Sequence, residues 1–224
     1  VSAADGHTTI FDWLKGQYIN DKIKEIYQSL ETYPPLIFVS LGVNHDYSSQ
    51  PHYLSFPLKK PLIIYDEEIG RITLRNHSFD PNLAPKGKTT FTVAIETNYD
   101  HWIELKNKRD EYLDEKKKIG ESIVNGISEL YPGIRDQIEV IDVATPLTFI
   151  RFTGNWKASY EGWLFTKKSY ASQIPQTLPG LSNFYMAGQW VSPGGGLFGA
   201  ATSAKNVVQM ICKNEKIRFK ASKP

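Results

Sequence analysis

One segment near the end of the chain holds residue types and a spacing that could bind a cofactor. The short apolar run 184–187 predicts a buried strand, and apolar residues at helical spacing from Leu197 to about Cys212 predict a helix. Between these elements lie the candidate binding residues, which are Gly188, Gln189, Gly194, Gly195 and Gly196. The sequence therefore predicts a strand, a glycine-rich loop and a helix in succession.

A glycine-rich loop before a helix can bind a phosphate or the electron-rich edge of a flat ring. The first N–H groups of a helix have no partner within it, and this end carries about half a positive charge. Glycines let a ligand approach the backbone, and the small residues 199–201 and Ser203 let the helix lie close to a ring or a sheet. The spacing alone equally fits a glycine-rich loop before an ordinary core helix.

The segment Tyr185–Leu197, YMAGQWVSPGGGL, resembles the C-terminal flavin-binding segment of the phytoene desaturase and carotenoid isomerase family. Members of that family are FAD-dependent oxidoreductases, so the resemblance implies FAD as cofactor and hydride transfer as reaction. It implies that the five candidate residues and Leu197 contact the flavin end of FAD. We further expect an apolar, isoprenoid or polyene substrate near Trp190 and Phe198, and we assign no catalytic acid or base.

Other segments resemble the family less closely. Asp5 and Gly6 match the end of a strand of the FAD domain, although Asp5 is by residue type more typical of a turn or a helix cap. The run Thr145–Thr148 resembles a Thr-Pro-x-Thr segment that precedes a loop near the flavin. Ala158 stands where many relatives have glycine, and Glu161 interrupts their Tyr-Gly pair. These departures concern the substrate side of the expected site.

The Gly-x-Gly-x-x-Gly fingerprint of dinucleotide-binding domains does not occur in the chain. We therefore expect the C-terminal part of a larger flavoenzyme, with its N-terminal FAD domain as the missing partner. Residues 1–32 are expected to hold the end of an FAD-domain strand and connecting helices, 33–170 the substrate-binding domain, and 171–224 the return segment. Without the FAD domain, this chain is expected to lack FAD and to be inactive, because the diphosphate contacts lie in that domain.

Runs rich in β-forming residues predict the fold class, which is α/β (α+β) with a mixed, largely antiparallel sheet covered by helices. Leu36–Val43 is a candidate central strand, and the alternation in Lys88–Thr97 is the clearest strand pattern. Further strands are expected at 53–58, 61–65, 69–76 and 138–143, and a long helix or a broken pair at 102–130. Segments 1–4 and 184–187, as severed pieces of a Rossmann-type FAD domain, are expected to lie near each other.

Composition excludes several classes of function. The net charge is +2 with scattered Lys and Arg, which argues against a nucleic-acid partner. One cysteine and five scattered histidines give no metal-site spacing. No apolar run approaches the ~18–20 residues that cross a membrane. The single cysteine favours a reducing, cytoplasmic location, with peripheral membrane contact as the alternative.

Three alternative functions fit the same plan. The chain could be a non-catalytic module that binds an apolar ligand or a partner. It could belong to an isomerase, which needs reduced flavin without net oxidation, or to an amine oxidase-like enzyme, which shares a similar two-domain arrangement. An upstream dinucleotide-binding fingerprint would favour the enzymes over the binding module.

Overall fold

The computed structural model describes residues 1–221, which form two compact units. The first unit combines Val1–Pro34 with the chain from Phe152 onward, and the second is Pro35–Arg151. The structure thus groups 152–170 with the two ends of the chain, whereas the sequence places them in a substrate domain spanning 33–170. The roles assigned to the three sequence ranges stay predictions.

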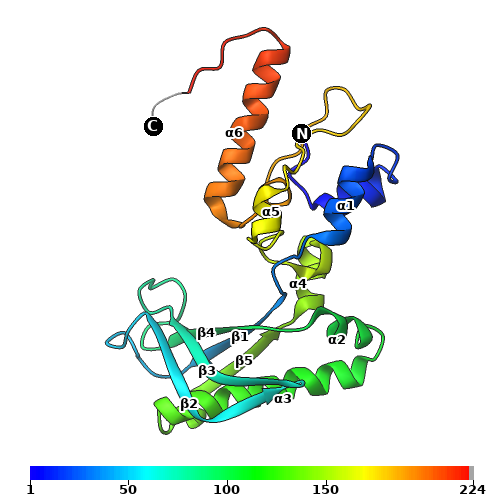
Figure 1. Ribbon diagram of the computed structural model, residues 1–224. Helices are drawn as coiled ribbons and strands as arrows, with labels where there is room; N and C mark the ends of the chain where they lie inside the picture. The colour runs from blue at the N-terminus through cyan, green and yellow to red at the C-terminus, as the bar shows by residue number, and fades with distance from the viewer. Residues whose placement is uncertain (222–224) are drawn as a thin grey trace. The chain divides into compact units, whose positions relative to one another are not determined.

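The Pro35–Arg151 unit is built on a five-stranded antiparallel sheet. Its strands follow the order β2-β3-β4-β1-β5 (Figure 1) and comprise β1 (Leu36–Val43), β2 (Tyr53–Ile64), β3 (Glu67–Asn76), β4 (Thr89–Glu96) and β5 (Ile138–Ala144). The predicted fold class is confirmed, and β1 lies between β4 and β5 as a central strand. The two short strands predicted over 53–65 form one strand, whose register shifts between Pro57 and Leu62.

The burial of side chains in strand β4 follows the alternating pattern of its sequence. Thr89, Phe91, Val93 and Ile95 are at most 7% exposed, while the residues between them are only half-buried. Successive side chains of a strand point to opposite faces, so every second residue enters the core. Strand β4 pairs antiparallel with the preceding strand β3, and Val93 lies opposite Leu74.

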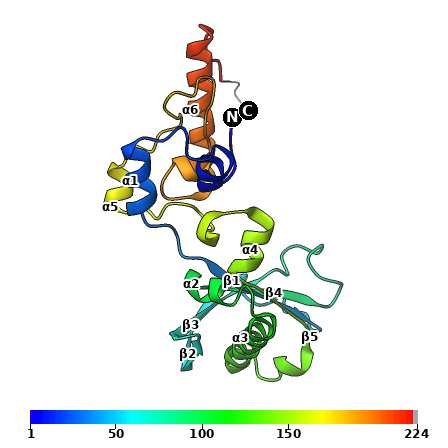
Figure 2. The ribbon, with the colours of Figure 1, turned by 90° about the vertical axis from the view of Figure 1, so that its right-hand side faces the viewer.

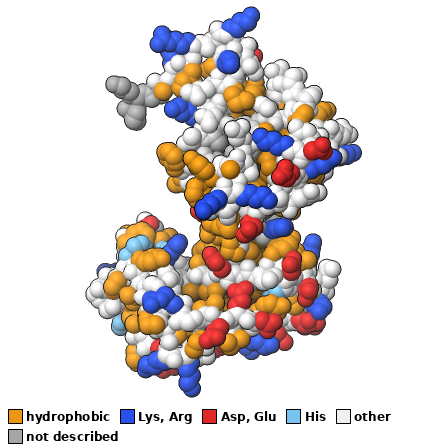
Figure 3. All heavy atoms as spheres, in the orientation of Figure 1, with side chains coloured by type: hydrophobic (Ala, Val, Ile, Leu, Met, Phe, Trp, Pro, Cys, Tyr) orange, Lys and Arg blue, Asp and Glu red, His pale blue; other side chains and the backbone are white. Residues whose placement is uncertain are grey.

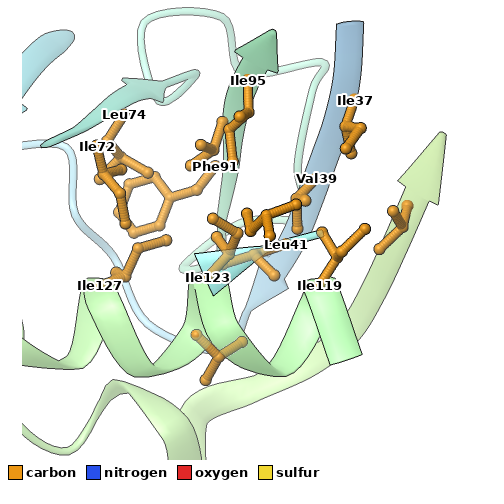
Figure 4. Packing of buried hydrophobic residues seen from close by; sticks show 14 of the residues in the cluster. Ile37, Val39, Leu41, Ile72, Leu74, Phe91, Ile95, Ile119, Ile123 and Ile127 are labelled. Carbon is orange, nitrogen blue, oxygen red and sulfur yellow. The ribbon is translucent and has the colours of Figure 1, made fainter. Parts of the chain in front are cut away.

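Helix α3 (Arg109–Leu130) covers one face of this sheet. Ile119, Ile123 and Ile127 are fully buried and point toward the sheet residues, among them Leu41 and Phe91 (Figure 4). The spacing of four residues places these side chains on one helix face. Each such burial contributes about 1.5–3 kcal/mol. The helix and sheet therefore share one apolar core.

Shorter helices complete the second unit. They are α2 (Tyr99–Glu104), η2 (Ile134–Gln137) and α4 (Pro146–Thr153), the last of which crosses the boundary between the units. The helix predicted over 102–130 is the broken pair α2 and α3. Asn98 begins α2, because its side chain accepts hydrogen bonds from Asp100 N at 2.8 Å and His101 N at 3.4 Å.

The first unit consists of helices and loops. Its elements are the π-helical turn η1 (Thr8–Trp13), α1 (Asp21–Ser29), η3 (Trp156–Ala158), α5 (Lys167–Ala171), η4 (Gln189–Val191) and α6 (Gly196–Asn214). Helix α1 lies beside α5 (Figure 2) and begins after its cap Asn20, whose side chain accepts a hydrogen bond from Ile23 N at 3.0 Å. Helix α6 closely matches the range predicted from Leu197 to about Cys212.

The two segments expected to lie near each other do so. Ser2 N donates to Tyr185 O at 2.8 Å, and Ala187 N donates to Ser2 O at 2.9 Å, which makes a parallel bridge between Ser2 and Met186. Tyr185, Met186 and Ala187 are buried. This part of the architectural prediction is confirmed, although the pairing is a single bridge and not a longer strand.

The described surface agrees with the absence of a charge pattern in the sequence. On the face of the Pro35–Arg151 unit that Figure 3 shows, Lys and Arg, Asp and Glu, and hydrophobic side chains are interspersed. Within residues 1–221, no helix is long and apolar enough to cross a membrane. Over the same range, no three His, Cys, Asp or Glu side chains gather as a metal site would require.

Candidate functional site

The glycine-rich loop turns the chain through conformations that favour glycine. The φ angles of Gly188, Gly194, Gly195 and Gly196 are 104°, 97°, 61° and 75°. Residues with a Cβ atom rarely adopt these values. The predicted turn without side chains is present and leads directly into α6.

The start of α6 is open. Gly195 is its N-cap and supplies no side chain, and the N–H groups of Gly195, Gly196 and Leu197 have no hydrogen-bond partner among residues 1–221. Leu197 and Phe198 are 91% and 86% exposed. The positive end of the helix dipole is thus accessible and is bordered by two apolar side chains.

Trp163 fixes the loop from one side. Gly194 N donates to Trp163 O at 3.1 Å, and Trp163 Nε1 donates to Trp190 O at 3.0 Å. The Trp163 side chain is fully buried. Trp163 thus holds the loop at 190 through its ring N–H and at 194 through its backbone carbonyl, so the conformation of the loop depends on the position of this residue.

Glycine at 195 and at 162 allows the chain at 161–162 to approach residues 189 and 195 closely. A Cβ atom at Gly195 would overlap the Glu161 side chain, with its Cγ and Cδ atoms only 2.9 Å away. A Cβ atom at Gly162 would lie 3.0 Å from Gln189 O. Glu161, which departs from the family pattern, therefore lies against the glycine triplet and adds a negative charge there.

The second departure from the family pattern, the alanine at position 158, lies in a backbone conformation that favours glycine. Lys157 and Ala158 have φ angles of 55° and 53°, in the left-handed region that glycine adopts more readily. Ala158 is also buried. Such a backbone conformation favours the glycine that many relatives have at this position. Ala158 adopts the conformation although it carries a Cβ atom.

Ser203 holds the other side of the loop. Gly188 N donates to Ser203 Oγ at 2.8 Å, and Ser203 Oγ donates to Ala200 O at 2.7 Å. Gln176 Nε2 donates to Met186 O at 3.1 Å and to Ser203 O at 2.8 Å. Sequence reasoning identified Ser203 only as a small residue and missed Gln176, because no local pattern links it to the loop.

Asp5 lies shortly before η1 and its side chain accepts two backbone hydrogen bonds, as its residue type suggested. One carboxylate oxygen accepts from Thr8 N at 2.7 Å, and the other accepts from Trp156 N at 2.9 Å. His7 stacks on the Trp156 ring with centroids 5.0 Å apart.

The structure does not bring the two expected substrate-binding aromatics together. Trp190 is 2% exposed and packs in an aromatic cluster with Trp156, Trp163 and Tyr27, and its Nε1 has no hydrogen-bond partner among the described residues. Phe198 lies outside this cluster and is exposed. Gln189, half-buried, lies beside the cluster in η4, and its side-chain amide makes no hydrogen bond within residues 1–221.

Tyr27 makes the stability of this unit depend on pH. Burial in the aromatic cluster, and secondly the negative charge of Asp5, raise the pKa of Tyr27 above its usual value. The stability that the protonated phenol contributes is fully present below about pH 10, where a tyrosine in the unfolded chain ionises, and falls as pH rises toward the folded-state pKa. Tyr27→Phe is expected to lose less stability than the wild type above about pH 10.

Urea denaturation on both sides of that pH measures this difference. Tyr47, Tyr99 and Tyr131 also have raised pKa values from burial, so the variant should keep a smaller residual dependence. Equal losses of stability in the wild type and the variant would contradict the assignment to Tyr27.

The chain is similar in sequence to known enzymes over part of its length. It is 25% identical over 143 residues to a prolycopene isomerase of an Oncidium hybrid cultivar, which covers 63% of this chain and 24% of that protein. It is 28% identical over 112 residues to an all-trans-retinol 13,14-reductase of Danio rerio, which covers 46% of this chain and 18% of that protein. The chain thus spans about a quarter or less of the length of these relatives.

The structural comparison supports the fold. An oxidoreductase from Methanosarcina mazei matches with a TM-score of 0.52 and 14% identity, covering 92% of this chain and 42% of that one. No protein-family model matches the chain. The sequence relatives are FAD-dependent, and they extend the likeness beyond the glycine-rich segment. The chain is therefore a relative of the FAD-dependent, carotenoid-related oxidoreductases, as its glycine-rich segment predicts.

Proposed function

We propose that this chain supplies the substrate domain and the flavin-contacting segment of an FAD-dependent oxidoreductase that acts on an apolar polyene or isoprenoid. The observation that carries the proposal is the open start of α6, where the glycine triplet leaves three N–H groups without partners among residues 1–221. A dinucleotide-binding domain, whose fingerprint the sequence lacks, would hold the remainder of the cofactor.

The residues at the start of α6 fit the electron-rich edge of a flavin. Bound FAD would supply hydride transfer with a substrate C–H bond. The N–H groups of Gly195, Gly196 and Leu197 could donate to ring oxygen and nitrogen atoms, and Gly196 has no neighbour within 4 Å of a Cβ position, so a ring can approach it. These residues bind and orient the ring, and they carry out no proton transfer.

The helix dipole would tune the flavin. An anionic group at a helix start gains about 0.3–1 kcal/mol. For a two-electron couple, this is up to roughly 20 mV in favour of the reduced, negatively charged form. The nearby carboxylate of Glu161 acts in the opposite direction, since it repels that charge. Gln189 can hydrogen-bond to the cofactor through its amide without adding charge.

The proposed substrate class rests on two features. The exposed side chains of Leu197 and Phe198 offer apolar contact next to the flavin-contacting backbone. Two relatives are named for prolycopene and all-trans-retinol, which are apolar polyenes. One relative is named an isomerase and the other a reductase. The proposal therefore covers hydride transfer to or from a polyene and does not specify the direction.

Substrate-dependent changes of the flavin spectrum test this proposal. The natural protein that carries this sequence together with its FAD domain would be mixed anaerobically with a panel of isoprenoids and a panel of polar amines. Reduction of the oxidised flavin, or reoxidation of the reduced flavin, is expected with members of the isoprenoid panel. A response to the amines alone would favour the amine oxidase-like alternative, and a flavin-free protein would favour the binding module.

A further inference from the structure

A cavity of about 580 Å³ lies wholly within the Pro35–Arg151 unit and shares no residue with the glycine-rich loop. It is formed by α2, the beginning of α3 and α4, which lie beside one another in Figures 1 and 2. Its size falls in the range of about 300–1,000 Å³ that is typical of small-molecule sites. The cavity therefore has the dimensions of a binding site of its own.

The lining of this cavity combines apolar side chains with positive charge. The apolar part comes from Ile103, Leu105, Leu147 and Ile150, together with the rings of Tyr99 and Tyr112. The charged lining residues are Lys106, Arg109, Lys116 and Arg151, and none of the lining residues is acidic. All four formal charges in the lining are thus of one sign.

Two of these cations lack a carboxylate partner. Neither Lys106 nor Arg109 makes an ion pair within residues 1–221, although the neighbouring Lys108 pairs with Glu111 at 3.4 Å. Lys116 Nζ lies 5.7 Å from the centroid of the Tyr112 ring, which it faces as a cation–π contact. Positive charge near an apolar wall is stabilised when an anion comes to it, and no carboxylate of residues 1–221 pairs with Lys106 or Arg109.

Buried anchors hold the walls in place. Trp102 is fully buried, and its Nε1 donates to Thr97 Oγ1 at 3.0 Å, which fixes α2 to the end of β4. The Tyr112 hydroxyl is hydrogen-bonded to Thr145 Oγ1 at 3.0 Å, which ties α3 to the start of α4. Leu105 is buried at the turn between α2 and α3. The cavity is therefore formed by the folded unit itself.

We propose that this cavity binds an anionic amphiphile, a molecule with one apolar chain and a phosphate or carboxylate head group. The chain packs on the apolar wall, and the head group pairs with Lys106 and Arg109. A neutral chain would leave the cations without a partner, and a cationic head group would be repelled. The proposal does not depend on the flavin assignment, because it uses none of the residues of the loop.

The same chemistry can come from a free amphiphile or from the head group of an anionic membrane lipid, and two arms of one experiment distinguish these sources. In the first arm, the 224-residue chain is titrated with monomeric dodecyl phosphate, dodecanol, dodecyltrimethylammonium and inorganic phosphate. In the second arm, it is mixed with vesicles of phosphatidylcholine, with and without phosphatidylglycerol. Binding is measured by calorimetry or by co-sedimentation.

Charge substitutions at the cavity give the decisive comparison. Lys106→Gln with Arg109→Gln removes two exposed cations of the lining and should leave the fold intact. The matched control, Lys59→Gln with Lys60→Gln, removes the same charge from exposed positions of β2 outside the lining. Dodecyl phosphate, or the phosphatidylglycerol vesicles, should bind the cavity variant about tenfold or more weakly, and the control as the wild type.

Binding of dodecyl phosphate as a monomer would assign the site to a free amphiphile, and binding of anionic vesicles alone would assign it to a lipid head group. Several results would overturn the proposal. They are equal weakening by the two double substitutions, binding of inorganic phosphate or dodecyltrimethylammonium as tight as that of dodecyl phosphate, and no binding in either arm. None of these measurements involves FAD. A negative result would therefore overturn the cavity proposal without bearing on the proposed function.

Discussion

Replacing Gly195 by valine is expected to lower the free energy of unfolding of the first unit by about 2–5 kcal/mol. Two effects add. A β-branched residue at a φ of 61° costs about 1–2 kcal/mol, and overlap with the Glu161 side chain costs about 1–3 kcal/mol. The loop would shift to relieve the overlap, so flavin content in the holoprotein should fall as well.

Urea denaturation followed by tryptophan fluorescence measures the effect, because four of the five tryptophans lie in this unit. Gly87→Val, with a φ of 81° and no atom within 4 Å of its Cβ position, is the matched control in the other unit. Gly87→Val should lose only the stability that the strained backbone conformation costs, about 1–2 kcal/mol, and the holoprotein should keep its flavin. If the two variants lose equal stability, Glu161 does not pack against Gly195 as described.

Truncation of Trp163 to alanine is expected to cost the first unit about 3–5 kcal/mol. The ring is fully buried, and its centroid lies 5.0 Å from that of Tyr27 and 5.2 Å from that of Trp190. The substitution leaves a cavity and also removes the donor to Trp190 O. We therefore expect both lower stability and a less ordered glycine-rich loop.

Trp13→Ala is the matched control, since the same side chain is 64% exposed there and should contribute about 0.5 kcal/mol or less. Circular dichroism in urea measures stability without relying on the deleted fluorophore. Hydrogen exchange at Gly194 reports on the loop directly, because its N–H donates to Trp163 O. Similar losses in the two variants would show that Trp163 does not organise the loop.

The parts of the fold that the sequence predicted were those set by local patterns. Alternation predicted β4, and the glycine-rich loop before Leu197 predicted the start of α6. The proximity of the segments at Ser2 and Met186 was predicted from the family resemblance, since no local pattern pairs residues so far apart in the chain. Where local signals were mixed, as at Pro57 in β2, the predicted boundaries failed because tertiary packing carried the strand across the proline.

The site was predicted only in part, for a physical reason. Backbone conformation at the glycine triplet is a local property, so the turn was accessible from sequence. The contacts of Glu161 with Gly195, and of Ser203 with Gly188, join residues from different elements and could not be inferred without the fold. The same applies to Lys106 and Arg109, which looked like scattered surface charge until α2, α3 and α4 enclosed a cavity between them.

The visible absorbance spectrum of the longest natural protein that contains this sequence tests whether the glycine-rich loop binds a flavin. We expect flavin bands in that protein and their loss or marked reduction in its Gly195→Val variant. The 224-residue chain alone should stay colourless after incubation with FAD, because contacts at the flavin end leave little to offset the ~4–15 kcal/mol that association costs. A longer protein without flavin, or a Gly195→Val variant that keeps its full flavin content, would contradict the placement of the cofactor at the glycine-rich loop.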